Sequence, residues 1–233
     1  MAGTVLIHMI GNRDLQFDRT ITSDEMELFE FEKNSDQTSF LVLKKLVQKK
    51  IDQQKEENVV TFLKQTKKLL GLLATEKHKD LKSKIHFPMF TQVAEYVSAK
   101  GFTLDRVVFC VTKQKNEYPT DTTYVADIIE KYFEKDLLEK YGIKEIAYEK
   151  MTMNLASRPE TFSYCYEKML PQLVKGYDKV FISHKQGHPF VTFSLLLAGL
   201  FEPYTFLVTN AKGAATEEDI NFYGNKLKQN FTT

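Results

Sequence analysis

The sequence predicts an α/β protein of the Rossmann-like, doubly wound type, in which helices cover both faces of a mainly parallel sheet. Five short runs rich in Val, Ile, Phe or Tyr alternate with longer segments of helical periodicity. The runs are apolar almost throughout, which indicates strands buried on both faces. A chain of 233 residues, 42% hydrophobic with 18 Phe and 11 Tyr, has enough apolar surface for such a core.

The expected elements follow one another along the chain. Strands are predicted at residues 4–10, 106–112, 143–150, 178–183 and 204–208. Helices are predicted at residues 37–56, 58–74, 89–99, 122–141, 160–175, 189–201 and 216–229. Residues 34–100 interrupt the alternation, because one crossover here carries two or three helices and no strand. We interpret them as a helical insertion in a single domain that spans residues 1–233 and ends in a C-terminal helix.

Composition limits the possible partners. The net charge is +1 with 27% charged residues, so no overall field points to nucleic acid or a membrane. Cys110 and Cys165 lie in apolar stretches, which argues against a disulfide framework or a zinc site and favours a reducing cytoplasm. The start of the chain does not resemble a signal peptide, and the longest apolar run, residues 190–201, is too short to span a bilayer. We therefore expect a soluble, cytoplasmic protein without a membrane segment.

Lysines gather in the insertion. Residues 44–84 hold 12 Lys against 5 acidic residues, a balance that also occurs in nucleic-acid interfaces. Arginine and interleaved aromatic residues are missing, so the solvated face of amphipathic helices is the preferred interpretation.

Polar residues follow four of the predicted strands. In an open parallel sheet, ligands bind outside the carboxyl ends of the strands. The residues found there are cations, amides, hydroxyls and glycines: Gly11, Asn12, Arg13 and Asp14 after the first strand; Thr112, Lys113, Gln114, Asp121 and Thr122 after the second; Asn154 and Arg158 after the third; Ser183, His184, Lys185, Gln186, Gly187 and His188 after the fourth. Helices that begin just beyond these loops direct their N-termini at the same crevice, which favours an anion.

The fourth loop gives the sharpest prediction. Gly187-His188-Pro189 fits a tight turn with proline at the first helical position, and Lys185 lies beside it. A phosphate-bearing ligand is expected, although neither GxGxxG nor GxxxxGK[ST] occurs. His184 and His188 do not fit a metal pair, since they straddle the strand end and no HExxH is present, so no metal and no cofactor are predicted.

These segments resemble the CARF domains of CRISPR-associated proteins, whose ligands are the cyclic oligoadenylates made by type III CRISPR complexes. The resemblance lies in "IGNRD", in "TKQ" followed by "DT", in "NLASRPETF" and in "ISHKQGHPFVTFSLLLAGLF", in this order over nearly the whole chain. The fourth segment departs from the commoner Gly-Gly-Thr type of turn.

The resemblance implies a homodimer that holds a cyclic tetra- or hexa-adenylate across its two-fold axis. By position, the ligand-binding residues would be Gly11, Asn12, Arg13, Asp14, Thr112, Gln114, His184, Lys185, Gln186, Gly187 and His188. Arg13 and Lys185 would offset phosphate charge, while Asn12, Gln114 and Gln186 suit adenine edges or ribose hydroxyls.

Structural interpretations remain open for several of these residues. Arg13 and Asp14 also fit a mutual ion pair or a cap, and His184 also fits a buried structural histidine. Asp121, before Thr122, is predicted first as a helix N-cap. Gly187 serves the turn in either case.

Three functions follow from this pattern. The leading one is a sensor of cyclic oligoadenylate, either stand-alone or as part of a longer chain that carries an effector. The second is a ring nuclease that cleaves its ligand without metal by attack of the ribose 2'-OH, with Lys185, His188 and Arg13 as catalytic candidates and His188 as a general acid. The third is a Rossmann-like enzyme with a nucleotide cofactor. No HEPN ribonuclease motif RxxxxH occurs, because the residues five positions after the arginines are Asp18, Asp24, Val111 and Ser163.

Overall fold

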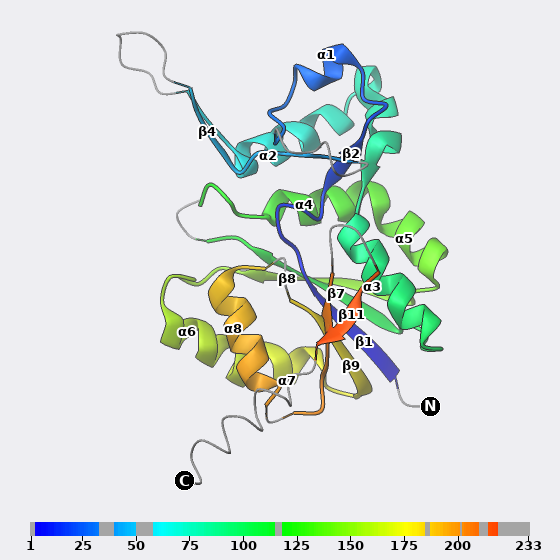
Figure 1. Ribbon diagram of the computed structural model, residues 1–233, viewed down its shortest axis with the longest axis vertical. Helices are drawn as coiled ribbons and strands as arrows, with labels where there is room; N and C mark the ends of the chain where they lie inside the picture. The colour runs from blue at the N-terminus through cyan, green and yellow to red at the C-terminus, as the bar shows by residue number, and fades with distance from the viewer. Residues whose placement is uncertain are drawn as a thin grey trace.

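A six-stranded sheet forms the centre of the molecule (Figure 1). The computed structural model describes residues 3–32, 40–49, 58–114, 118–184, 187–200, 202–209 and 214–218. The sheet has the order β11-β10-β9-β1-β7-β8. Its strands are β1 (Gly3–Met9), β7 (Arg106–Thr112), β8 (Glu145–Met151), β9 (Tyr177–Ser183), β10 (Thr205–Val208) and β11 (Thr216–Glu218).

The first five of these strands pair in parallel, and β11 is antiparallel to β10. Counted along the chain, the parallel strands lie in the order 3-2-1-4-5, which is the Rossmann order. The predicted Rossmann-like α/β fold is therefore confirmed. The direction of winding reverses between β1 and β9, so this is the place where such folds bind ligands.

One face of the sheet packs on the C-terminal helices. Val5, Ile7 and Met9 of β1 belong to this core. They meet the π-helical η4 (Tyr164–Met169), α7 (Leu170–Leu173) and α8 (Pro189–Ala198), and α6 (Arg158–Ser163) leads directly into η4. Side chains in a strand alternate between the faces, which explains why every second residue of β1 enters this core.

The opposite face packs on the other helices. Leu6 of β1 and Phe109 of β7 enter this second core. Its helices are α2 (Phe62–Leu73), α3 (Pro88–Ala99), α4 (Thr123–Ile128), the π-helical η3 (Ile129–Phe133) and α5 (Glu134–Tyr141). Because both faces are covered, the central strands β1 and β7 are buried at nearly every position, whereas the edge strand β8 carries Glu and Lys and is mostly half-buried.

The predicted strands and most predicted helices are confirmed to within a few residues. Proline begins α3 and α8, where its missing N–H costs no hydrogen bond. Gly142 ends α5 with a φ of 63°, a conformation that glycine adopts without strain. The helix predicted from residue 58 begins at Phe62 instead, since the Thr61 hydroxyl caps it by accepting from Lys64 N at 3.2 Å.

The prediction that residues 34–100 contain no strand is wrong. β3 (Phe40–Val42) and β4 (Leu46–Lys49) replace part of the helix predicted at 37–56, whose other residues mostly lie outside the described part. β3 pairs with β2 (Gln16–Asp18), which also pairs with β6 (Ile85–His86), and β4 pairs with β5 (Asn58–Thr61). The pairings of β2 join segments distant in sequence, β4 and β5 form a local hairpin, and both override the helical periodicity. The 3-10 segment η2 (Glu76–Lys84) lies in the same region, and the short α1 (Ser23–Met26) precedes it in the chain.

The helix predicted at 216–229 is wrong at its start, where β11 occupies residues 216–218, and residues 219–229 lie outside the described part. Hydrogen bonds to β10 and an anchor to α3 favour the strand: Tyr96 Oη donates to Glu217 Oε1 at 2.5 Å. No helix in the described ranges combines the length and apolar character that a membrane crossing requires.

Candidate ligand-binding site

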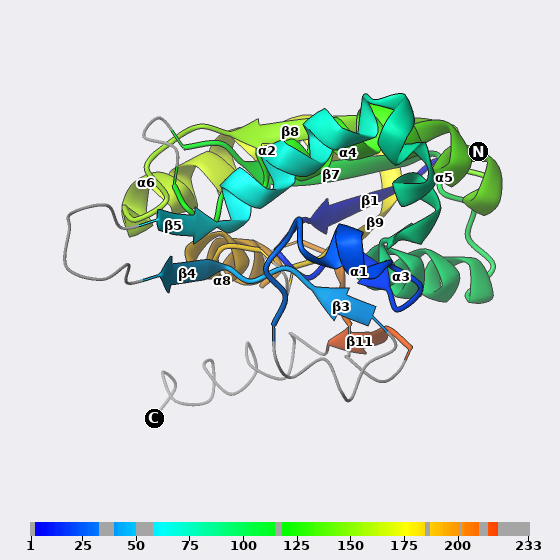
Figure 2. The same ribbon diagram turned by 90° about the horizontal axis from the view of Figure 1, so that it is seen from above.

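A hollow of about 150 Å³ lies at the carboxyl ends of β1, β7 and β9, at the point where the sheet reverses its winding. Figure 2 shows β1 and β8 pointing to the same side of the molecule, where the β4–β5 hairpin also lies. The hollow is lined by Ile10, Gly11, Asn12, Lys45, Thr112, Gln114, Thr120, Thr122, Gly187, His188 and Pro189.

The turn after β1 is held from beneath by Asp14. Asp14 Oδ2 accepts from Gly11 N at 2.7 Å, and Asp14 N donates to Gly11 O at 3.2 Å. The other oxygen, Oδ1, lies 2.7 Å from Nε2 of the fully buried His8. A carboxylate with both oxygens engaged fixes the turn, so that Gly11 and Asn12 are presented to the hollow.

Asn12 brings an unused donor to this wall. Its Nδ2 is shielded from solvent and has no hydrogen-bond partner in the described part of the chain. A buried amide normally finds an acceptor. Asn12 is therefore suited to donate to a bound ligand.

Two residues of the "GNRD" segment do not reach the hollow. Arg13 is 53% exposed at its side chain, and its Nη2 lies 3.5 Å from Glu32 Oε2. Asp14 is buried in the contacts just described. Asp14 therefore does not face the ligand as predicted, because its carboxylate is bonded to Gly11 and His8. Arg13 does not pair with Asp14 either, since it pairs with Glu32.

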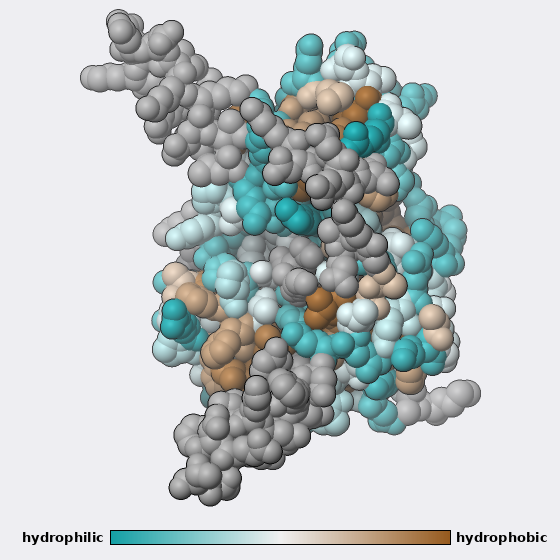
Figure 3. All heavy atoms as spheres, viewed as in Figure 1, coloured by the Kyte–Doolittle hydropathy of each residue, from teal (hydrophilic) through white to brown (hydrophobic). Residues whose placement is uncertain are grey.

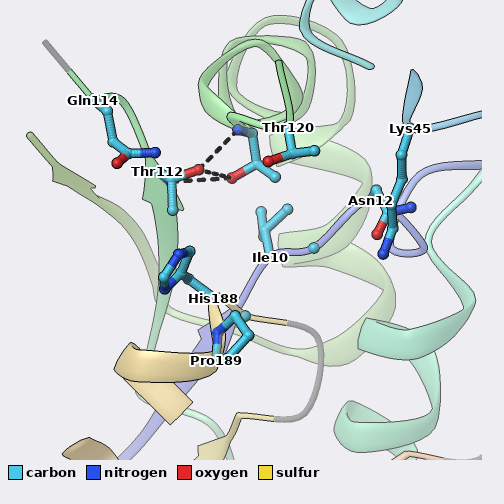
Figure 4. A pocket seen from close by; sticks show the side chains of 11 residues that line it. Ile10, Asn12, Lys45, Thr112, Gln114, Thr120, His188 and Pro189 are labelled. Carbon is cyan, nitrogen blue, oxygen red and sulfur yellow. Dashed lines mark hydrogen bonds between the residues drawn. The ribbon is translucent and has the colours of Figure 1, made fainter. Parts of the chain in front are cut away.

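The second loop is organised by Asp121. Its Oδ2 accepts from Gln114 N and Tyr118 N at 3.0 Å each, and its Oδ1 accepts from Gln114 Nε2 at 3.2 Å. Asp121 is therefore not the predicted N-cap of α4, a position that Thr122 occupies without a capping bond from its side chain. Thr122 instead bonds Thr112, which closes the loop onto the end of β7 and places Gln114 at the hollow (Figure 4).

The fourth loop comes close to β1. A Cβ at Gly187 would lie 3.0 Å from Met9 Cβ, so a larger residue there would press on the strand. His188 is the N-cap of α8, and its Nδ1 accepts from Phe190 N at 3.3 Å. Burial lowers the pKa of His188 from its ordinary value, although the Asp121 carboxylate acts in the opposite direction.

These contacts assign a role to the His188 ring. With a lowered pKa the ring is neutral near pH 7, and with Nδ1 as the acceptor its proton lies on Nε2. His188 is thus suited to donate one hydrogen bond from Nε2, and it is not a cation at neutral pH.

His184 lies outside the hollow. Its side chain is 4% exposed, and its Nε2 lies 3.0 Å from Glu218 Oε2 on β11. The structural interpretation therefore holds for His184. Lys185 and Gln186, which were predicted as ligand-binding residues, lie outside the described residues.

The third loop does not line the hollow either. Asn154 is exposed, and its Oδ1 accepts from Ala156 N at 3.1 Å. The Arg158 guanidinium lies 4.9 Å from the centre of the Phe190 ring, in a cation–π contact with α8.

Sequence reasoning missed Lys45. It reaches the hollow from the segment between β3 and β4, and Figure 4 draws it beside Asn12 on the wall across from His188 and Gln114. Site residues were predicted only from the segments that follow the strands of the sheet, and Lys45 belongs to the insertion. Thr120 was missed too, although it lies in the segment quoted after β7.

The described residues contain no group of three or more His, Cys, Asp or Glu placed to hold a metal ion. Cys110 and Cys165 are free thiols, both buried in the core between the sheet and α6–α8. Burial raises the pKa of both thiols, to about 12 for Cys165, so neither is a ready nucleophile.

Comparison with known proteins adds no assignment. No protein-family model matches the chain, and no curated protein sequence is significantly similar to it. The function is therefore argued from the geometry of the hollow and the residues around it.

Proposed function

We propose that the protein is the sensor of a type III CRISPR accessory system and binds a cyclic tetra- or hexa-adenylate across the two-fold axis of a homodimer. One observation carries the proposal. At the reversal point of a Rossmann-like sheet, a single hollow is lined by residues from three of the four CARF-like segments: Gly11, Asn12, Thr112, Gln114, Gly187 and His188.

The donors of the hollow suit a nucleotide. The Asn12 amide and the Nε2–H of His188 are available to phosphate or ribose oxygens, and the N-terminus of α8 adds its positive dipole end. No carboxylate belongs to the lining described above, and the nearby Asp121 has its oxygens engaged by Gln114 and Tyr118. Gln114 adds its amide oxygen and the second hydrogen of its Nε2, whose first hydrogen goes to Asp121 Oδ1, and such groups read adenine edges.

The size of the hollow supports a shared ligand. Its volume of about 150 Å³ lies below the range of about 300–1,000 Å³ usual for small-molecule pockets. A ring of four or six nucleotides would extend well beyond it. A second copy that contributes the same hollow across a two-fold axis would accommodate the remainder of a symmetric ring.

An exposed apolar surface on α8 and η4 supports the dimer. Phe193 of α8 is 57% exposed and Tyr166 of η4 is 37% exposed. Figure 3 shows hydrophobic side chains gathered over α6 and α8. Apolar groups clustered in this way commonly mark a protein interface.

The proposal is tested with purified protein and cyclic tetra- and hexa-adenylate, with linear tetra-adenylate as the comparison. We expect calorimetry to show one ring per two chains, and we expect Asn12→Ala to weaken ring binding by about tenfold or less, the value of one hydrogen bond. Asn154→Ala, in the loop outside the hollow, is the matched control. If neither ring binds, the sensor proposal is wrong.

The same samples separate the sensor from the ring nuclease. Mass spectrometry of the ligand after hours of incubation shows an intact ring if the protein only binds it. Linear products would assign the nuclease instead. A nucleotide cofactor carried through native purification would support the third function, the Rossmann-like enzyme.

A further inference from the structure

Lys45 differs from most of the insertion's other lysines in having no local partner. Lys44 Nζ lies 3.5 Å from Glu30 Oε2, Lys82 Nζ lies 2.8 Å from Asp136 Oδ2, and Lys84 Nζ lies 2.6 Å from Glu25 Oε2. Lys68 Nζ donates to Leu28 O at 2.8 Å. Lys45 Nζ makes no ion pair and no side-chain hydrogen bond with any residue in the described ranges.

The backbone at Lys45 is nevertheless fixed. Lys45 O accepts from Phe62 N at 3.0 Å, at the start of α2. The preceding residue is held on both sides, because Lys44 N donates to Glu30 O at 2.8 Å and Lys44 O accepts from Gln65 Nε2 at 3.0 Å. The side chain of Lys45 therefore starts from an anchored point and extends into the hollow.

Among the residues that line the hollow, Lys45 carries the positive charge. Arg13, the cation predicted for this place, pairs with Glu32 outside the hollow. Asn12, whose Nδ2 is shielded and unpartnered, lines the same wall (Figure 4). An ammonium group beside an amide donor forms a binding point for a phosphate oxygen.

We infer that Lys45, carried by the insertion, is the phosphate contact of this site, and that the insertion thereby selects phosphate-bearing ligands over nucleosides. The inference rests on the proposed function for the nature of the whole ligand. The inference goes beyond the proposed function, because it assigns the cation of the site to a residue outside the four strand-end segments. A ring shared by two copies would meet two such lysines.

The test compares Lys45→Gln with Lys44→Gln, its neighbour, whose ammonium is paired with Glu30 and does not line the hollow. Glutamine keeps a polar side chain and removes the charge. Circular dichroism and thermal melting verify that both variants fold. Binding of the cyclic rings, AMP and adenosine is then measured by calorimetry at low and at moderate salt.

We expect Lys45→Gln to weaken binding of the rings and of AMP by about tenfold or more, the usual cost of one charge-assisted hydrogen bond. Adenosine, which has no phosphate, is expected to bind both proteins alike, and Lys44→Gln is expected to behave like the wild type. The affinity of the wild type for AMP should fall more steeply with salt than that of Lys45→Gln.

The outcomes separate this inference from the proposed function. Equal affinity of wild type and Lys45→Gln for the rings and AMP overturns the inference and leaves the sensor intact. Lys45-dependent binding of AMP without any ring binding overturns the sensor and leaves the inference intact. If the wild type binds no phosphate-bearing probe, both are overturned.

Discussion

The imidazole of His8 lies 2.7 Å from the carboxylate of Asp14, Nε2 to Oδ1, and the two side chains are 0% and 2% exposed. His8 belongs to the buried strand β1, whereas Asp14 ends the turn that presents Gly11 and Asn12 to the hollow. The pair thus ties the candidate site directly to the core of the sheet. Phe90 and Phe109 pack edge-on against the His8 ring and hold its orientation.

We expect Asp14→Asn to destabilise the protein and to weaken ligand binding. His8 Nδ1 is buried and has no hydrogen-bond partner in the described part of the structure, so His8 uses Nε2–H as donor to Asp14. In Asp14→Asn, the side-chain oxygen of the asparagine can keep the contact with Gly11 N. Its NH₂ group then faces His8 Nε2–H, so that two donors point at each other. A buried donor without an acceptor costs about 1–3 kcal/mol, which should appear in the free energy of unfolding measured with urea.

Asp178→Asn is the matched control, because Asp178 is exposed on β9 and should change the free energy of unfolding little. An Asp14→Asn protein as stable as the wild type would show that the pair does not hold the turn.

Much of the sheet could be predicted because its information is local. β1, β7 and β9 are apolar runs whose residues enter two cores alternately, and this needs no knowledge of the rest of the chain. The segment 40–49 was mispredicted because β3 and β4 depend on partners at residues 16–18 and 58–61. The pairing with residues 16–18 is distant and leaves little trace in local periodicity, and in the hairpin of β4 and β5 cross-strand contacts outweigh helical propensity.

The candidate site, like the sheet, was predictable only where its residues follow from local sequence. Gly11, Asn12 and Gly187 follow strands that the sequence reveals, and the geometry of parallel sheets brings them together. The contacts of Asp14 depend on the turn folding back onto His8, and the place of Lys45 depends on how the insertion folds back. Both are tertiary features without a local signal.

Gly199 and Gly71 should respond to alanine in opposite ways. A Cβ at Gly199 would lie 2.7 Å from Phe206 Cζ and closer still to Cε2, and Phe206 is 1% exposed. We expect Gly199→Ala to lower the free energy of unfolding by about 1–3 kcal/mol through overpacking. At Gly71, in α2, a Cβ would meet nothing within 4 Å. We therefore expect Gly71→Ala to raise the free energy of unfolding by about 0.5–1 kcal/mol through the higher helix propensity of alanine.

Urea unfolding of the two variants beside the wild type measures this difference. If Gly199→Ala proves as stable as the wild type, α8 and β10 can separate without cost at this contact.

Phe193→Asp is expected to dissociate the proposed homodimer. A carboxylate on the apolar surface of α8 would have to be desolvated in the interface, at a cost of several kcal/mol. Sedimentation should then show a monomer, with ring binding lost and AMP binding retained. Met26→Asp, at a residue 44% exposed on α1, is the matched control and should leave the assembly unchanged. A variant Phe193→Asp that remains dimeric places the interface elsewhere.

His188 should make the stability of the protein depend on pH. Burial lowers the pKa of its ring from the ordinary value of 6.5, so the unfolded chain binds more protons than the folded one just below that pH. The stabilisation from the neutral ring is complete above pH 6.5 and is lost as the pH falls through the lowered pKa. His188→Asn keeps an acceptor for the N-terminus of α8 and cannot titrate.

We therefore expect the melting temperature of the wild type, relative to His188→Asn, to fall as the pH decreases from about 8 to about 5. Subtracting the two curves cancels the contributions of the other histidines, which both proteins share. A difference that is constant over this range would show that the ring titrates alike in the folded and unfolded chain. Near pH 6.5 the ring would then be partly protonated, and its Nδ1 would accept from Phe190 N only in the neutral fraction of the protein.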